Sequence, residues 1–411
     1  MTEAACPKHV VVVGASLAGL RAVQTAREVN FEGRLTLIGD EIHLPYDRPP
    51  LSKEYLADGP LTTAHKFPET ADLTERLDVD VRTGTRAESL DVQGRTVTTS
   101  RGEIVDFDAL LIATGVRARR LPGTERLAGV HVLRDLDDAE SIREALDARA
   151  RVVVIGAGFI GAEVASAAVK RGLDPIILEA AATPLVRAVG EEGGRGLARM
   201  HERNGVDLRC GVAVSEVLGD DRVEGVRLAD GTEIAADLVV IGIGADPATD
   251  WLETSGLRID NGVVCDETLR ATDGIWAAGD VARWSNPLFG TSMRLEHWTN
   301  AGEQAAHAME NLLSPADASP YQHVPYFWSD WYGQRIQFAG LPVGKPHVVS
   351  GSWDSDDLVA LYRNGDRLVG ALAVNRRGDI MKYRVQISRR GTWSAAMAFA
   401  DKRNAAIAAS A

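Results

Sequence analysis

Two stretches of this chain repeat one pattern of apolar strand, glycine-rich turn and helix. The first, near the start, reads HVVVVGASLAGLRAVQTAREVN, and the second, from Arg151, reads RVVVIGAGFIGAEVASAAVKRG. Each begins with a continuous apolar run, typical of a parallel strand buried on both faces, and continues with the apolar spacing of a helix. A further strand then ends at Asp40 in the first copy and at Glu179 in the second. The repeat predicts two βαβ units and therefore an α/β fold.

The second copy carries the complete glycine pattern of a dinucleotide-binding turn, Gly156, Gly158 and Gly161. In such a turn the first glycine allows the tight bend, the second allows backbone to approach a pyrophosphate, and the third allows helix to pack on strand. The helix N-terminus favours the phosphate charge. Glu179 follows Gly156 by 23 residues, at the spacing of a ribose-binding acid. These features together predict a dinucleotide site.

The first copy departs from this pattern at its middle position. Gly14 and Gly19 are present, but Ser16 stands where the second glycine is expected. A side chain there crowds the pyrophosphate, although its hydroxyl can donate to a phosphate oxygen. Asp40 again supplies a ribose-binding acid, so we predict a second dinucleotide site here.

Glu179 also predicts which nicotinamide cofactor is used. Its carboxylate accepts hydrogen bonds from the 2′-hydroxyl of NADH and repels the 2′-phosphate of NADPH. The next residues, Ala180 to Ala182, provide no arginine for that phosphate. We therefore expect NADH as the hydride donor.

Three further stretches carry a family resemblance: FDALLIATGVRARRLPG, TDGIWAAGD ending at Asp280, and YDRPPLSKEY from Tyr46. They resemble the FAD-dependent pyridine-nucleotide oxidoreductases. YDRPPLSKEY is similar, more narrowly, to the NADH:ferredoxin reductases of bacterial oxygenase systems, the group of putidaredoxin reductase and biphenyl dioxygenase reductase. That similarity continues through VLRDLDDAESI, RLEHWTNAGEQA and PYFWSDWYG.

The resemblance implies a glutathione-reductase-like fold with two Rossmann-like dinucleotide-binding domains and a C-terminal α+β domain. The expected boundaries are 1–115 and 247–320 for the FAD-binding domain, 116–246 for the NAD-binding domain, and 321–411 for the C-terminal interface domain. Asn364-Gly365 between two apolar runs predicts a hairpin in the last domain, and the alanine-rich tail after Thr392 predicts a helix.

The resemblance also implies the positions that contact the cofactors. The expected FAD contacts are Ala18, Asp40, Arg48, Lys53, Ala87, Arg134, Gly279, Asp280 and Trp298. Lys53 is expected beside flavin N5 and Glu163 near the nicotinamide, so we predict a Lys53–Glu163 ion pair at the site of hydride transfer. Two interpretations of Trp328 stay open: it covers the flavin or lines the electron exit, or it belongs to an aromatic core.

Composition narrows the functions that the chain can have. It holds 45 basic and 58 acidic residues, for a net charge of −13, so we expect no nucleic-acid partner. No apolar run is long enough to span a bilayer, and the first residues do not resemble a signal peptide. We predict a soluble, cytoplasmic protein without membrane insertion.

The three cysteines are Cys6, Cys210 and Cys265, and none lies in a glycine-rich unit or in YDRPPLSKEY. No metal site and no redox-active dithiol is predicted. Electrons must therefore leave the flavin for an external acceptor.

The predicted function is that of an NADH-dependent FAD reductase of a [2Fe-2S] ferredoxin, which serves a cytochrome P450 or a ring-hydroxylating dioxygenase. Alternatives are a rubredoxin reductase, a small-molecule reductase acting on quinones or oxygen, and a redox-sensing protein like apoptosis-inducing factor. An acidic ferredoxin would need a local basic patch on so acidic a protein. The candidates for that patch are Arg294, Arg335, Lys345, Arg376, Arg377 and Lys382.

Overall fold

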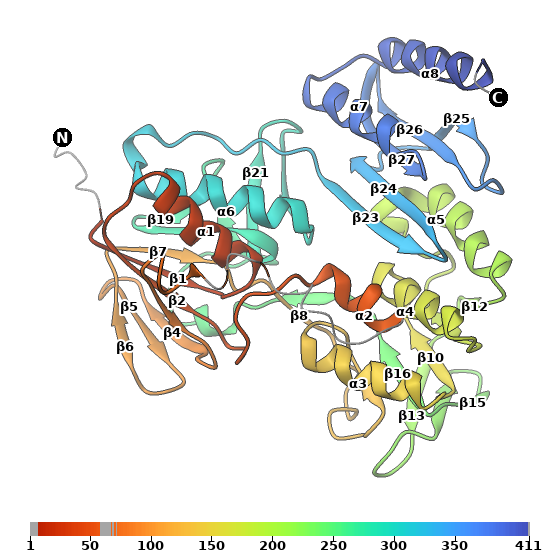
Figure 1. Cartoon of the computed structure of the whole chain (residues 1–411), viewed down its shortest axis with the longest axis horizontal. Helices are drawn as coiled ribbons and strands as arrows, with labels where there is room; N and C mark the ends of the chain where they lie inside the picture. The colour runs from red at the N-terminus through yellow and green to blue at the C-terminus, as the bar shows by residue number, and fades with distance from the viewer. Residues whose placement is uncertain (1–6, 58–66, 68–69, 71, 410–411) are drawn as a thin grey trace. The chain divides into compact units, whose positions relative to one another are not determined.

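The computed structural model describes residues 7–57, 67, 70 and 72–409, and these form two compact units (Figure 1). Unit 1 comprises the described residues of Met1–Asp47, Thr63–Arg117 and Asp246–His323. Unit 2 comprises those of Arg48–Thr62, Ala118–Ala245 and Val324–Ala411. The boundaries predicted for three domains stay a prediction. The described part of Arg48–Thr62, expected in the FAD-binding domain, groups with unit 2.

Unit 1 is built around a six-stranded sheet in the order β19-β20-β7-β1-β2-β3. These strands are β1 (His9–Val13), β2 (Arg34–Ile38), β3 (Val79–Arg82), β7 (Ala109–Ile112), β19 (Arg270–Thr272) and β20 (Ile275–Ala277). The central strand β1 is buried along its whole length and pairs in parallel with β2 and β7. Helices α1 (Leu17–Glu28) and α6 (Trp298–Leu313) lie side by side (Figure 1). The first predicted βαβ unit is therefore confirmed.

Unit 1 also contains two three-stranded sheets. The antiparallel one consists of β4 (Ala87–Asp91), β5 (Thr96–Thr99) and β6 (Ile104–Asp106). The mixed one consists of β18 (Val263–Cys265), β21 (Ala282–Asn286) and β22 (Thr291–Arg294). Unit 1 also includes the short helices η4 (Asp250–Leu252), η5 (Gly279–Val281) and η6 (Pro315–Asp317). The strands β8 (Val116–Ala118) and β17 (Ala245–Pro247) pair where the chain passes from one unit to the other.

Unit 2 contains a second sheet, in the order β12-β11-β10-β16-β9. Its strands are β9 (Val130–His131), β10 (Val152–Ile155), β11 (Ile176–Glu179), β12 (Asp207–Cys210) and β16 (Leu238–Ile241). Its helices are α3 (Leu136–Asp147), α4 (Phe159–Lys170) and α5 (Val186–Arg203). The succession β10-α4-β11 is the second predicted βαβ unit, with β10 parallel to β11.

Two additions accompany this sheet. A small antiparallel sheet is formed by β13 (Val214–Leu218), β14 (Gly225–Leu228) and β15 (Glu233–Ala235). The segment with η1 (Pro49–Ser52) and α2 (Glu54–Ala57) packs against α3 and α4. The Arg171 guanidinium, just after α4, donates to the Leu56 carbonyl at 2.6 Å.

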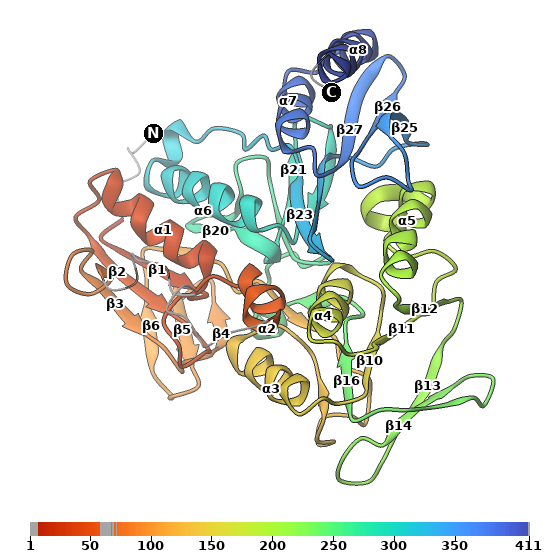
Figure 2. The same cartoon turned by 45° about the vertical axis from the view of Figure 1, so that its right-hand side comes forward.

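The C-terminal part of unit 2 is a five-stranded antiparallel sheet with two helices (Figure 2). The elements are β23 (Tyr326–Trp331), β24 (Gln334–Gly340), β25 (His347–Gly351), β26 (Leu358–Asn364), β27 (Arg367–Val374), α7 (Arg377–Ser388) and α8 (Trp393–Ala408). One face of the sheet packs in a single apolar cluster with α4 and α5, while α7 lies on β24 and β27. The predicted hairpin is present, with Asn364 paired to Arg367, and the predicted helix follows Thr392.

Candidate functional site

In the first glycine-rich turn, which lies in unit 1, the packing of the backbone by itself requires glycine at two positions. Gly14 has a φ of 119°, and an added Cβ would lie 2.1 Å from the Ala113 carbonyl oxygen. A Cβ on Gly19 would lie 1.9 Å from the carbonyl oxygen of Gly14. Ser16 is the N-cap of α1 with extended backbone at φ −114°, so the fold accepts its side chain. Serine in place of the glycine expected at position 16 therefore changes the surface in front of α1 and leaves the backbone of the turn intact.

Other predicted FAD contacts come close to this turn within unit 1. A Cβ on Gly279 would lie 3.2 Å from Cβ of Ala18, so η5 with Asp280 adjoins the start of α1. The Gly279 N–H donates to the buried side chain of Gln304 at 2.8 Å. The Trp298 ring, at the start of α6, is 41% exposed and its Nε1 donates to Asp47 at 2.7 Å.

Asp40 and Ala87 lie in two segments of unit 1 that are joined by a backbone hydrogen bond. Asp40 is exposed just beyond β2, and the preceding residue, Gly39, accepts a hydrogen bond from the Thr85 N–H at 2.7 Å. Ala87 is buried at the start of β4, two residues after Thr85. An exposed carboxylate at this strand end suits ribose hydroxyls.

The second glycine-rich turn, in unit 2, shows which glycine the fold does not require. A Cβ on Gly156 would lie 2.4 Å from the Gly242 carbonyl oxygen, and one on Gly161 2.2 Å from the Gly156 carbonyl oxygen. Gly158, the N-cap of α4, has an ordinary φ of −78°, and its nearest neighbour would be Gly242 at 3.7 Å. Packing leaves room for a side chain at Gly158. The room in front of α4 fits a pyrophosphate that approaches the backbone.

The Glu179 carboxylate is fixed beside this turn. One oxygen accepts the Ala157 N–H at 2.8 Å, and the other accepts the Ala181 N–H, also at 2.8 Å. Glu179 is half-buried, and each of its oxygens has a second lone pair for a ribose hydroxyl. A negative charge is thus held at the end of β11 where the sequence places it.

Lys53 and Glu163 form the predicted ion pair inside unit 2. The Lys53 Nζ lies 2.9 Å from Glu163 Oε2, with the two side chains 12% and 2% exposed. Lys53 Nζ also donates to the Pro49 carbonyl at 3.2 Å. An ammonium has three hydrogens, so these bonds leave one for another acceptor. Burial of such an ion pair costs free energy of folding unless its remaining donors and acceptors are also hydrogen-bonded.

Two serine hydroxyls complete the environment of Glu163. Ser52, next to Lys53, donates to Oε2, and Ser329 on β23 donates to Oε1 at 2.5 Å. The carboxylate is thus contacted by Lys53, Ser52 and Ser329. Sequence reasoning missed both serines, although they stand within YDRPPLSKEY and PYFWSDWYG. Nothing in those motifs indicates which partner a serine bonds.

Arg48 and Arg134 also meet in unit 2. The Arg48 guanidinium donates to the Arg134 carbonyl at 2.5 Å, and the Arg134 N–H donates to Asp138 at 2.9 Å. Asp138 belongs to the capping box that starts α3 with Asp135. Burial, reinforced by the charge of Asp135, raises the pKa of Asp138 to about 6. This local network fixes Arg48 at the start of η1.

Trp328 lies on β23, on the opposite face of the strand from Ser329. Its ring centroid is 6.5 Å from that of Tyr326, and the Arg384 guanidinium of α7 lies 5.2 Å above the Tyr326 ring. Trp328 is half-buried. Both of its predicted roles remain predictions.

The candidate basic patch separates into paired and exposed residues. Arg294 is half-buried and paired with Glu296, Arg335 binds Asp330 through two bonds of 2.7 and 2.9 Å, and Arg376 is paired with Asp357 and Asp379. Their charges are offset locally. Of the six candidates for the basic patch, the exposed residues outside these ion pairs are Lys345, Arg377 and Lys382, and the last two lie on α7.

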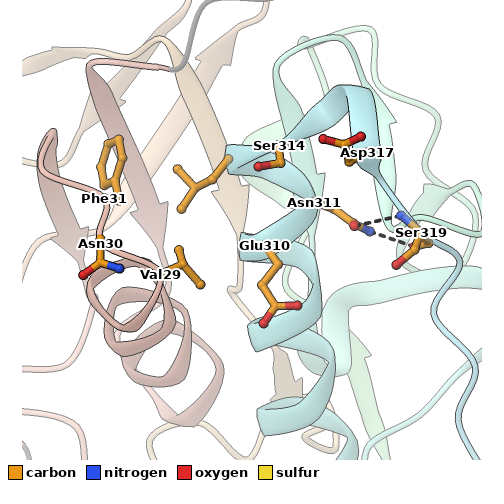
Figure 3. Close-up of a pocket in the computed structure, with 9 residues that line it drawn as sticks. Val29, Asn30, Phe31, Glu310, Asn311, Ser314, Asp317 and Ser319 are labelled. Carbon is orange, nitrogen blue, oxygen red and sulfur yellow. Dashed lines mark hydrogen bonds between the residues drawn. The ribbon is translucent and has the colours of Figure 1, made fainter.

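A surface pocket of about 340 Å³ opens in unit 1 between the last residues of α1 and α6 (Figure 3). It is lined by Val29, Asn30, Phe31, Glu310, Asn311, Leu313, Ser314, Asp317 and Ser319. Asn311 bonds Ser319 through its side chain in both directions, at 2.9 and 3.0 Å. The pocket lies at the C-terminal ends of these helices, whereas Ser16 and Trp298 mark their N-terminal ends. It includes none of the predicted site residues.

Two of the three cysteines lie among the described residues. Cys265 is buried, which raises the pKa of its thiol, and burial also raises the pKa of the half-buried Cys210. Cys6 lies outside the described residues. Among residues 7–57, 67, 70 and 72–409, no cluster of three or more His, Cys, Asp or Glu side chains is arranged to hold a metal. No helix in the same ranges is long and apolar enough to cross a membrane.

Comparison with known proteins matches most of the chain. Residues 8–305 match the pyridine nucleotide-disulphide oxidoreductase family, and residues 326–405 match the reductase C-terminal family. Rhodocoxin reductase of Rhodococcus erythropolis is 37% identical over 91% of this chain and 88% of its own. The ferredoxin–NAD(+) reductase component of the p-cumate 2,3-dioxygenase system of Pseudomonas putida is 35% identical over 93% and 94%. The reductase in a covalent putidaredoxin reductase–putidaredoxin complex superposes with a TM-score of 0.88, at 34% identity over 93% of both chains.

Proposed function

We propose that this chain, which belongs to the pyridine nucleotide-disulphide oxidoreductase family, is an FAD-dependent NADH:ferredoxin reductase. It takes a hydride from NADH and delivers two electrons, one at a time, to a [2Fe-2S] ferredoxin. That ferredoxin serves a cytochrome P450 or a ring-hydroxylating dioxygenase. The similarity to ferredoxin reductases of both kinds of system supports the proposal. For each NADH oxidised, two ferredoxins are reduced and one proton is released.

The observation that carries the proposal is the buried Lys53–Glu163 pair next to the Gly158 turn. Both residues belong to unit 2, and Glu163 is five residues after Gly158 on α4. A cation and a carboxylate held so close to a dinucleotide turn suit the transfer of a hydride, because charge moves there. Bound FAD supplies the hydride acceptor and the step from two-electron to one-electron chemistry.

The residues of the chain then have positioning and electrostatic roles. With FAD and NADH bound, Lys53 would direct its remaining hydrogen toward the flavin and would favour negative charge there. Glu163 holds Lys53 in place and would accept a hydrogen bond from the nicotinamide amide. Glu179 would accept hydrogen bonds from the adenine ribose of NADH, and Asp40 would do the same for FAD. Asp280 and Trp298, with Ala18, provide the remaining FAD contacts of unit 1.

The cysteines explain why the acceptor is a separate protein. Members of a family named for disulphides could pass electrons to a dithiol beside the flavin, but the glycine-rich units and YDRPPLSKEY contain no cysteine. Cys210 and Cys265 stand on β12 and β18, in different units. We therefore assign electron transfer to an external one-electron acceptor, for which an iron–sulfur protein is suited.

The proposal is tested by the pre-steady-state reduction of the flavin. The purified protein should contain one FAD per chain, and NADH should bleach it. Lys53→Ala and Glu163→Ala should each slow this reduction, and their double-mutant cycle should be non-additive because the residues form one pair. Lys170→Ala, at the far end of α4, is the control. If neither single change at the pair affects the rate, the assigned hydride site is incorrect.

The acceptor is tested separately by steady-state turnover. A purified [2Fe-2S] ferredoxin should be reduced much faster than rubredoxin, quinone or oxygen. A protein whose flavin is reduced by NADH but which prefers a small-molecule acceptor would retain the cofactor assignment and lose the ferredoxin assignment.

A further inference from the structure

The carboxylate of Glu163 is bonded from two sides by segments far apart in the sequence. Ser52 and Lys53 reach Oε2 from the η1 segment, while Ser329 reaches Oε1 from β23 of the C-terminal sheet. All belong to unit 2. Lys53 and Ser52 act on one oxygen only. Ser329 is the donor on the other oxygen, so it helps to set the rotation of the carboxylate about its last bond.

The direction of the Ser329 hydroxyl is itself fixed. Trp331 Nε1 donates to Ser329 Oγ at 2.7 Å, and an indole N–H can only donate. The serine oxygen is thus an acceptor toward Trp331, and its single hydrogen is directed to Glu163 Oε1, 2.5 Å away. The chain of bonds runs one way, from indole to hydroxyl to carboxylate. Each donation strengthens the next.

The groups packed around this series of hydrogen bonds leave its side chains little freedom to move. Ser329 is 0% exposed and Trp331 1% exposed. The Trp331 ring packs at 5.1 Å between centroids on the buried ring of His201. Burial lowers the pKa of His201 to about 4, so this ring is neutral at physiological pH. Backbone pairing of Ser329 with Ile336 fixes the strand. Water therefore does not replace the hydroxyl without rearrangement of the packing.

We propose that Ser329 is a positioning residue for hydride transfer, oriented by Trp331. By holding Glu163 Oε1, it keeps Oε2 directed at Lys53 and the ammonium in its catalytic position. This inference rests on the proposed function of the Lys53–Glu163 pair. It gives the C-terminal sheet a part in the NADH half-reaction, in addition to any contact with the electron acceptor.

The test compares Ser329→Ala with a matched control. Ser166→Ala removes another hydroxyl from the same region, since Ser166 on α4 accepts the Tyr332 N–H at 2.7 Å and does not bond Glu163. Both variants should retain FAD and should have similar thermal unfolding midpoints. Ser329→Ala should slow flavin reduction at saturating NADH by roughly ten-fold or more, within the usual range of coupling in one network. Ser166→Ala should change it by less than about two-fold.

The second arm is a cycle that leaves Glu163 unchanged. Trp331→Phe keeps an aromatic ring on His201 and removes the N–H. It should slow reduction in the wild-type background and have almost no effect in the Ser329→Ala background. Ser329→Thr, which retains a hydroxyl, should recover most of the rate. The dissociation constant of NAD⁺ from the oxidised holoprotein, measured by the perturbation of the flavin spectrum, should change much less than the rate in every variant.

The possible outcomes distinguish a failure of the proposed function from a failure of the proposed role of Ser329. Wild-type protein that NADH does not reduce would overturn the proposed function and this inference with it. Normal reduction of the wild type, with additive effects of Ser329→Ala and Trp331→Phe or equal slowing in Ser166→Ala, would overturn the role of Ser329 alone. A rate loss matched by an equal loss of NAD⁺ affinity would also contradict positioning, because it would indicate a binding defect.

Discussion

Preference for NADH over NADPH should be lost when the charge of Glu179 is removed. This expectation rests on the position of the wild-type side chain, whose two oxygens each accept a backbone N–H at 2.8 Å, from Ala157 and from Ala181. A 2′-phosphate must either lie beside this carboxylate or displace it. Each alternative costs binding free energy, and NADPH binds in whichever of the two ways costs less.

The two costs can be estimated. Two unit charges about 5 Å apart repel by roughly 1 to 3 kcal/mol at an effective dielectric between that of water and that of a protein surface. Displacement of the carboxylate breaks two hydrogen bonds to a charged group, at about 1.5 to 3 kcal/mol each. Repulsion is therefore the smaller cost. A preference of about 2 kcal/mol, or ~30-fold, is expected.

The assay is stopped-flow reduction of the flavin by each cofactor, with the ratio of second-order rate constants as the result. Glu179→Gln keeps an oxygen acceptor and should bring the ratio close to one. Glu179→Ala with Ala180→Arg should favour NADPH, since residue 180 is exposed and an arginine there can bind the phosphate. Asp174→Asn, an exposed change in the same unit, is the control. Equal reduction of the wild type by both cofactors would refute this reasoning.

Two further predictions follow from the second turn and from the exposed cations. Gly158→Ala should weaken NADH binding by about ten-fold or more, because a side chain there prevents the close approach of backbone and pyrophosphate, and it should leave the thermal unfolding midpoint unchanged. Gly161→Ala, in contrast, should lower that midpoint, because its Cβ would lie 2.2 Å from the Gly156 carbonyl oxygen. Ferredoxin turnover should fall steeply as salt is raised, with no change in NADH reduction, and Arg377→Glu or Lys382→Glu should flatten that dependence more than Arg335→Glu. A turn variant that binds NADH normally, or turnover indifferent to salt, would contradict these expectations.

The parts of the fold that depend on local sequence could be predicted. Gly14 and Gly156 adopt positive φ in tight turns between strand and helix, and that requirement is visible in a short stretch of sequence. The hairpin after Asn364 and the helix after Thr392 are equally local. Helix α7 was missed, although Ile380, Tyr383 and Ile387 are buried on one face, because a glycine and many polar residues obscure that spacing.

The contacts that depend on tertiary structure could not be predicted from patterns. Ser329 and Glu163 are 166 residues apart, and a serine has the same sequence signature whether it bonds a carboxylate or faces water. Arg335 was a candidate for the basic patch, but Asp330 stands opposite it in the β23–β24 pairing and forms an ion pair with it. Such neutralisation follows from strand register, which the sequence indicates only when the turn is recognised.

The alternation of side chains along β23 connects these observations. Ser329 and Trp331 point to the face of the sheet that packs with α4, while Trp328 and Asp330 point to the other face, where Arg384 of α7 lies over Tyr326. One strand therefore bears the donor to Glu163 and the residue predicted at the flavin or the electron exit. A one-residue slip of β23 would exchange the two sets of side chains at once. The register of this strand should consequently be as important to hydride transfer as any residue of the glycine-rich turns.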